Sequence, residues 1–155
     1  GRLAVAAALA IALVVSSLID LASFRLPDWL TLPLVPAGWL AGVAMVGADA
    51  LPWLMLGAAG GYLLLAGVAT LYRTLRGRDG LGLGDAKLFA AAGAWVGPDG
   101  LAPVLLTACL LALAGLLAAA FHTGHRLGPT TRLPFGPAIA AGLWLVWLAQ
   151  MSARP

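Results

Sequence analysis

The sequence predicts an all-α fold: a polytopic membrane helix bundle with about six transmembrane helices. Hydrophobic residues make up 62% of its 155 residues and charged residues only 10%, and the mean hydropathy is +0.98. The apolar residues occur in long runs that lack the alternation of a barrel strand, and in hydrocarbon only helices and closed barrels satisfy the backbone. Most runs are about 17–21 residues long, near the length that a helix needs to cross a hydrocarbon core of ~30 Å.

Apolar runs bounded by proline, glycine or charge indicate where each helix lies. We expect helices at residues 3–19, 32–48, 52–71, 86–96, 101–121 and 135–151. The fourth is short for a span, and we expect it either to be extended by neighbouring residues or to be buried among the other helices. The whole chain, residues 1–155, is predicted to form a single membrane-embedded domain.

The positions of lysine and arginine predict the orientation of the bundle. Seven of these nine residues lie in or beside the connections that follow the first, third and fifth helices: Arg25, Arg73, Arg76, Arg78, Lys87, Arg126 and Arg132. The positive-inside rule puts these connections in the cytoplasm and both termini on the opposite side. The three least lipid-like stretches, residues 20–31, 77–87 and 133–137, then converge on the cytoplasmic face. The basic residues are too few and too scattered for a nucleic-acid surface, so we expect no nucleic-acid partner.

Two aspartates stand at the edges of apolar runs on this predicted face. Asp20 ends the first run, where an ionisable group is costly and indicates either function or simply the water interface. Asp85 ends Gly82-Leu83-Gly84-Asp85, whose glycines allow another segment to approach closely. The alternative for Asp85 is an N-cap favoured by the helix dipole. Two carboxyl groups brought together can share a proton while one acts as base toward water, as in an aspartic protease.

Other polar residues near these aspartates have more ordinary interpretations. Asp28 is expected to serve as a turn or capping residue at the start of the second helix. Lys87 is expected either to tune the charge of Asp85 or to sit at the membrane interface. His122 and His125 have i, i+3 spacing, but the sequence supplies no further residue to complete a metal site. We therefore expect no metal and no other cofactor.

Three ordered segments resemble the type IV prepilin peptidase family, whose members are GxGD-type membrane aspartic proteases. The segments are residues 19–20 with 25–34, residues 82–88 with 94–97, and residues 133–138. The resemblance implies an endopeptidase of the bacterial inner membrane, active at the cytoplasmic face, that serves type IV pilus or type II secretion systems. It implies that Asp20 and Asp85 are the catalytic pair. The supporting positions that it implies are Gly82, Gly84, Lys87 and Asp28.

The resemblance also implies the partners. These are the lipid bilayer and prepilin or pseudopilin substrates, which carry a basic leader followed by a hydrophobic helix. Longer members have an additional N-terminal region with a cysteine cluster and also methylate the cleaved substrate, so we expect this chain to be a short form or a fragment. Peptidase activity is implied more strongly than methyltransferase activity. The alternative is a non-catalytic scaffold or transporter-like module that binds pilin-like helices.

Overall fold

A computed structural model describes residues 1–77, 82–123 and 134–153, and every regular element in these ranges is a helix. The elements are α1 (Arg2–Ser23), α2 (Asp28–Val46), the short 3₁₀-helix η1 (Ala48–Ala50), α3 (Leu51–Arg76), α4 (Leu83–Thr123) and α5 (Gly136–Ala153). Within the described ranges, five stretches are long and apolar enough to cross a membrane. The predicted all-α membrane bundle is therefore confirmed.

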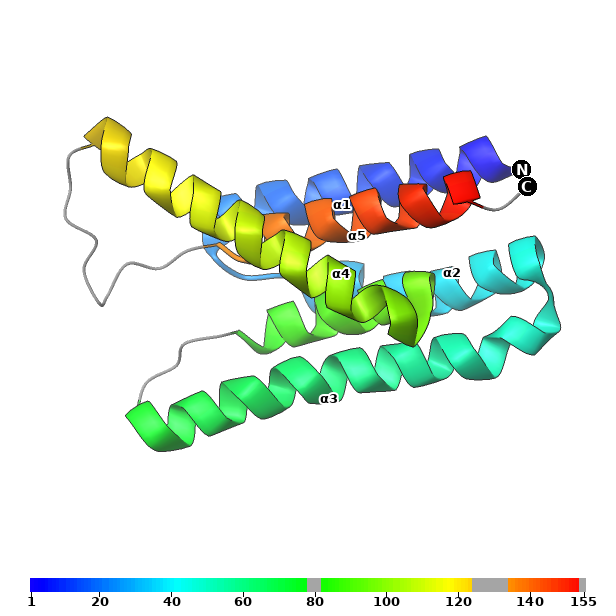
Figure 1. The fold of residues 1–155 in the computed structure, drawn as a ribbon, viewed down its shortest axis with the longest axis horizontal. Coiled ribbons are helices and arrows are strands. Elements are labelled where there is room, and N and C mark those ends of the chain that lie inside the picture. Colours follow the sequence, from blue (N-terminus) through cyan, green and yellow to red (C-terminus); the bar gives the residue numbers. More distant parts are fainter. Residues whose placement is uncertain (78–81, 124–133, 154–155) are drawn as a thin grey trace.

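The fourth and fifth predicted helices form the single element α4, which is broken at Gly97. This residue has φ 72° and ψ 178°, a non-helical conformation that glycine adopts readily, and Pro98 follows it. The chain turns back on itself at this break (Figure 1). We call residues 83–96 the first limb of α4 and residues 98–123 its second limb. The predicted count of about six helices is close, because this hairpin supplies two of them.

The two ends of the bundle differ in what they contain. Figure 1 shows both chain termini at one end, with the ends of α1 and α3, the starts of α2 and α5, and both ends of α4 toward the other. We call this second end, which carries Asp20, Asp28, Asp85 and Gly136, the motif end. Arg25, Arg73, Arg76 and Lys87 also belong to it, whereas Arg78, Arg126 and Arg132 lie outside the described residues.

The first limb of α4 is the most deeply buried segment of the described chain. It begins at Leu83, earlier than predicted, and α2, α3 and α5 all pack against α4. Nine of its apolar side chains are at most 8% exposed: Ala86, Leu88, Phe89, Ala90, Ala91, Ala92, Ala94, Trp95 and Val96. Both expectations for the short fourth helix, extension and burial, are confirmed.

Close backbone contact between α3 and α4 makes this burial possible. A Cβ atom at Gly57 would meet the carbonyl oxygen of Gly93 and lie 2.9 Å from the carbonyl carbon of Gly97. A Cβ atom at Gly61 would lie 2.6 Å from the carbonyl oxygen of Phe89. Small residues at such crossings let membrane helices approach closely enough for extensive van der Waals contact. The glycines therefore set the separation of α3 and the first limb.

Side chains from two other helices bind the polar groups near the break in α4. The Gln150 amide of α5 donates to the carbonyl of Val96 at 3.0 Å. The Trp53 indole N–H of α3 donates to Asp99 Oδ2 at 3.2 Å. Because lipid offers no hydrogen-bonding partner, irregular backbone in a membrane protein needs partners from the protein itself. These two contacts hold the reversal of α4 in place.

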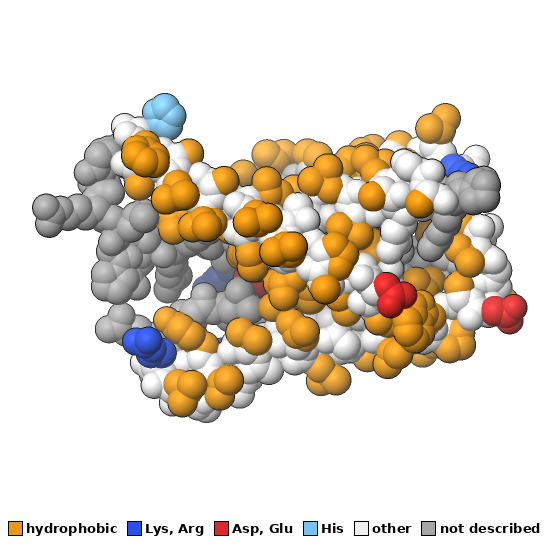
Figure 2. Space-filling model, viewed as in Figure 1, with side chains coloured by type: hydrophobic (Ala, Val, Ile, Leu, Met, Phe, Trp, Pro, Cys, Tyr) orange, Lys and Arg blue, Asp and Glu red, His pale blue; other side chains and the backbone are white. Residues whose placement is uncertain are grey.

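The outer surface of the bundle is apolar. Hydrophobic side chains cover most of the face shown in Figure 2, where charged side chains are few. Leu3, Leu40, Leu75 and Phe121 are 72–88% exposed. Such a surface suits contact with lipid, not water.

The α3–α4 contact predicts that Gly57→Ala destabilises the bundle. The added Cβ has no room against the backbone of Gly93, so overpacking should cost about 1–3 kcal/mol of unfolding free energy. Gly67→Ala is the matched control, because a Cβ there meets nothing within 4 Å. Thermal unfolding in one detergent, followed by circular dichroism, measures both variants. Equal midpoints for the two variants would contradict the packing described.

Candidate active site

Asp20 lies inside the last turn of α1. The predicted helix ends at residue 19, but α1 continues to Ser23, so this boundary was placed about one turn too early. Phe24 ends the helix in a left-handed conformation with φ 51°, and its N–H donates to the carbonyl of Asp20 at 2.8 Å. Leu26 precedes Pro27, and a residue before a proline disfavours the helical conformation, so the chain between α1 and α2 is not helical. Asp20 lies three residues before the end of α1, so a regular helical turn holds its backbone.

The carboxyl group of Asp20 is buried in the bundle. Asp20 is only 5% exposed, and its Oδ2 accepts a hydrogen bond from the backbone N–H of Gly136 at 3.1 Å. Ser16, one turn earlier on the same helix face, is fully buried and donates its hydroxyl to the Ala12 carbonyl at 2.7 Å. A buried carboxyl group needs hydrogen-bonding partners, and α5 supplies this one through its first residue.

Asp85 lies in the first turn of α4, where the bundle brings it near Asp20. Its own N–H donates to the carbonyl of Gly82 at 3.1 Å, and the Gly82 backbone N–H hydrogen-bonds its carboxyl group. Leu26 lies against both Gly84, which precedes Asp85, and Gly136, whose N–H binds Asp20. The fold therefore brings two acids that are 65 positions apart in the sequence to the same end of the bundle.

Leu26 packs between the start of α4, which carries Asp85, and the start of α5, whose amide binds Asp20. Leu26 is 9% exposed. A Cβ atom at Gly84 would lie 3.1 Å from Leu26 Cβ, and one at Gly136 would lie 3.2 Å from Leu26 Cδ1. Glycine at both positions leaves room for this close approach. Leu26 thus separates the starts of α4 and α5 by one leucine side chain.

Asp28 forms an ion pair and does not cap α2. It is the first residue of this helix, Pro27 occupies the N-cap position, and no described side chain caps the helix. Of the two roles predicted for Asp28, turn or cap, the capping role is therefore wrong, although the residue does lie at the start of α2. The carboxylate of Asp28 instead accepts from Lys87 Nζ at 2.6 Å, which ties the start of α2 to the start of α4. Lys87 thus has Asp28 as its partner.

Gly136 is the site residue to which the sequence analysis gave no role. Its segment was expected at the cytoplasmic face and resembles a family segment, but no residue of it was assigned a role, and Leu133 lies outside the described residues. The available signal was the pattern Pro134-Phe135-Gly136-Pro137, since proline and glycine mark the start of a helix. Nothing in that pattern shows that the Gly136 N–H meets a carboxyl group from α1.

The described ranges contain no group of three or more His, Cys, Asp or Glu side chains that could hold a metal ion. His122 is exposed near the end of α4, and His125 lies outside the described residues.

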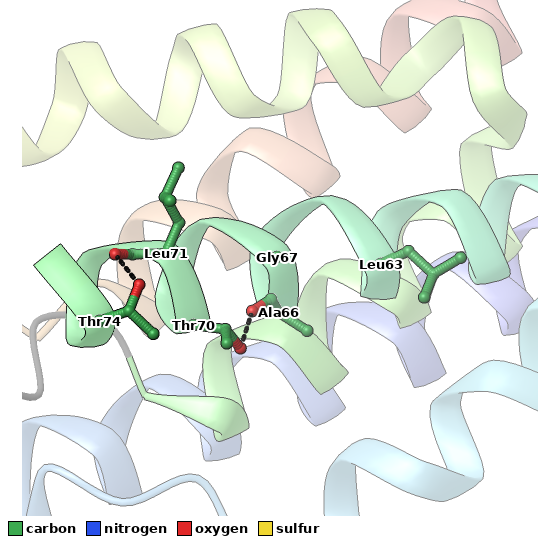
Figure 3. Close-up of a pocket in the computed structure, with 6 residues that line it drawn as sticks. All are labelled: Leu63, Ala66, Gly67, Thr70, Leu71 and Thr74. Carbon is green, nitrogen blue, oxygen red and sulfur yellow. Dashed lines mark hydrogen bonds between the residues drawn. The ribbon is translucent and has the colours of Figure 1, made fainter.

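Within the described residues, concave surfaces lie along α3 and between α1 and α5. One, of about 480 Å³, is lined within the described ranges by α3 residues that Figure 3 shows along that helix: Leu63, Ala66, Gly67, Thr70, Leu71 and Thr74. The hydroxyls of Thr70 and Thr74 donate to the carbonyls of Ala66 and Leu71, both at 2.8 Å, so their protons point into α3. We assign no chemistry to this depression.

The second surface is an apolar groove of about 260 Å³ between α1 and α5. Ser17 and Pro137 line it, together with Leu13, Leu18 and Trp144. Ser17 precedes Asp20 by about one helical turn and Pro137 follows Gly136, so the groove reaches the region of the carboxyl pair.

Comparison with known proteins agrees with the motifs. The sequence model of the type IV leader peptidase family matches residues 7–118. The prepilin leader peptidase/N-methyltransferase of Xanthomonas campestris pv. campestris is 40% identical over 135 residues, which cover 87% of this chain and 46% of that protein. The protein of the same name from Burkholderia pseudomallei is 42% identical over 131 residues, covering 84% of this chain and 41% of that protein.

A third relative, the prepilin leader peptidase/N-methyltransferase of Aeromonas hydrophila, is 39% identical over 137 residues, or 88% of this chain and 46% of that protein. The chain spans less than half the length of each of these relatives. No solved structure matches the chain.

The Asp28–Lys87 ion pair is predicted to contribute little to stability. The side chains are 57% and 28% exposed, respectively, and exposed pairs are worth about 0–1 kcal/mol. Lys87→Met and Asp28→Asn should each lower the unfolding free energy by no more than about 1 kcal/mol, with the double variant no worse than the single ones. Unfolding in detergent at low and high salt measures this. A loss of several kcal/mol in either variant would show a stronger link than this geometry supports.

Proposed function

Because this chain belongs to the type IV leader peptidase family, we propose that it is a membrane aspartic endopeptidase with Asp20 and Asp85 as its catalytic pair. Its substrates are prepilins or pseudopilins, and the bond that it cuts joins the leader to the rest of the substrate. In this proposal residues 1–155 act as one membrane-embedded peptidase domain.

One observation carries the proposal: α1 and α4 bring two acidic residues to the same end of an otherwise apolar bundle. Asp20 is 5% exposed and bound by a backbone amide of α5, and Asp85 lies in the first turn of α4, beside Gly84, which packs on the same Leu26 side chain as Gly136. Ionisable groups within membrane helices are costly, and they are a mark of function more than of stability. A scaffold that only binds helices has no need for this pair.

The chemistry follows from the proximity of the two carboxyl groups. When the two carboxyl groups share one site they cannot both ionise easily, so in the proposed mechanism one keeps a proton while the other is ionised. The ionised group takes a proton from a water molecule while the water oxygen attacks the carbonyl carbon of the scissile peptide, and the protonated group gives its proton to the carbonyl oxygen. The resulting tetrahedral diol collapses as the C–N bond breaks. The group that took the water proton passes it to the leaving amine nitrogen, and the other group regains a proton from a diol hydroxyl as the carboxyl product forms.

The substrate class agrees with the surroundings of the pair. The curated relatives are named as prepilin leader peptidases, and a leader of basic residues suits a site that contains Asp20, Asp28 and Asp85. The hydrophobic helix after the leader can lie in the bilayer beside the apolar groove between α1 and α5. The lysine and arginine bias supports a site on the cytoplasmic face of the bacterial inner membrane.

Conservative substitutions at the aspartates test the mechanism. Asparagine keeps the size of aspartate but cannot hold and exchange the proton, so Asp20→Asn and Asp85→Asn should each reduce cleavage of a co-purified prepilin by several orders of magnitude. The double variant should be little worse than either single one, because the two groups act as a unit. Leader removal is followed by mass spectrometry on purified variants with equal unfolding midpoints.

Two further aspartates are controls for this experiment. Asp28→Asn should reduce the rate by no more than about tenfold, or about 1.4 kcal/mol, because it breaks only a solvent-exposed ion pair. Asp49→Asn, exposed in η1, should have no effect. Near-normal cleavage by Asp20→Asn or Asp85→Asn would refute the mechanism and favour the non-catalytic scaffold or transporter-like module. A collapse at Asp28 with Asp20 unaffected would move the first catalytic role to Asp28.

The proposed orientation predicts the labelling of single cysteines. In a Cys109→Ala background, which removes the exposed native thiol, Ser23→Cys should react only from the cytoplasm and Asp49→Cys only from the opposite side. Both positions are exposed, and they lie at opposite ends of the bundle. Labelling of right-side-out and inverted vesicles with a membrane-impermeant maleimide measures this. Reaction of both cysteines from one side would contradict the predicted topology.

A further inference from the structure

The contact between α5 and Asp20 involves a backbone amide at a helix start. Gly136 is the first residue of α5, and its N–H donates to Asp20 Oδ2 at 3.1 Å. The first N–H groups of a helix have no acceptor within that helix, and the positive end of the helix dipole favours a carboxylate. The carboxyl group of Asp20 is therefore a favourable partner for the free N–H at the start of α5.

The space around Gly136 allows no side chain. A Cβ atom there would lie 2.6 Å from Oδ2 and 3.0 Å from Cγ of Asp20, closer than a Cβ atom ordinarily comes to either atom. On its other side Leu26 Cδ1 would be 3.2 Å away. A larger residue at this position would have to displace the Asp20 carboxyl group, because Leu26 closes the opposite direction.

We propose that Gly136 is the positioning residue of the catalytic pair and sets the rotation of the Asp20 carboxyl group through its backbone N–H. By holding Oδ2 toward α5, the amide leaves Oδ1 as the oxygen that exchanges the proton with Asp85 and water. This inference rests on the proposed peptidase function. Catalytic groups must be held to a fraction of an ångström, and misplacement by about 1 Å costs about 100-fold in rate.

The first test is the kinetics of Gly136→Ala in the full chain, with a purified prepilin as substrate. We expect kcat to fall about 100-fold and KM to stay within about twofold, because the change acts on the carboxyl group and not on substrate contacts. Gly115→Ala is the matched control and should keep wild-type kinetics, since a Cβ there meets nothing within 4 Å. Normal kcat in Gly136→Ala, or a rise in KM alone, would overturn the proposal.

The second test needs no catalysis and so separates this inference from the proposed function. Unfolding midpoints in detergent are compared for wild type, Gly136→Ala, Asp20→Ala and the double variant. If the added methyl group collides with the Asp20 carboxyl group, Gly136→Ala should lower the midpoint in the wild-type background and lower it much less when Asp20 is alanine. Additive effects would overturn the assigned contact, even if the wild-type protein cleaves prepilin.

The proposal can still be tested if the Gly136→Ala variant does not fold. Recovery of a folded protein in the Asp20→Ala/Gly136→Ala double variant would support the contact, because removing the carboxyl group makes room for the methyl group. Failure of both variants to fold would overturn it, since Leu26 would then be the limiting neighbour. A wild-type chain that cleaves no prepilin would refute the proposed function, while the unfolding comparison would still test the contact.

Discussion

Backbone contact between α3 and the first limb of α4 determines where Asp85 can be. Gly57 and Gly93 bring the two helices together without intervening side chains, and the limb is buried among α2, α3 and α5. A helix that is packed on all sides cannot shift without creating cavities or clashes, because protein interiors are close-packed. Asp85 sits in the first turn of this limb, so its position relative to Asp20 depends on glycines in the middle of the bundle.

Much of the architecture could be predicted because hydrocarbon leaves the chain few options. Long apolar runs must form helices in lipid, and the break at Gly97 falls between the predicted helices at 86–96 and 101–121. The helix ends were less predictable. Asp20, Asp28 and Asp85 were placed outside or at the edges of helices, yet each lies in a terminal turn. Hydropathy detects the loss of apolar residues, whereas the helix ends where its backbone hydrogen bonds end.

Contacts between particular residues of different helices could not be predicted from the sequence. Asp28 looked like a cap because it follows a proline at a helix start, but its partner is Lys87, 59 positions away. Gly136 was passed over because its contribution is an N–H group that every residue except proline possesses. It also lies beyond residues 7–118, the range that the family model matches. Which backbone donor meets which carboxyl group depends on how α1 and α5 pack, and no local pattern encodes that.

The short first limb of α4 also bears on how the protein enters the membrane. At 1.5 Å per residue, residues 83–96 rise roughly 21 Å, less than the ~30 Å of a hydrocarbon core. A segment of this length is too short to cross the hydrocarbon core by itself. The reversal at Gly97 joins it to the longer second limb, so the two limbs are best delivered to the bilayer together as a helical hairpin.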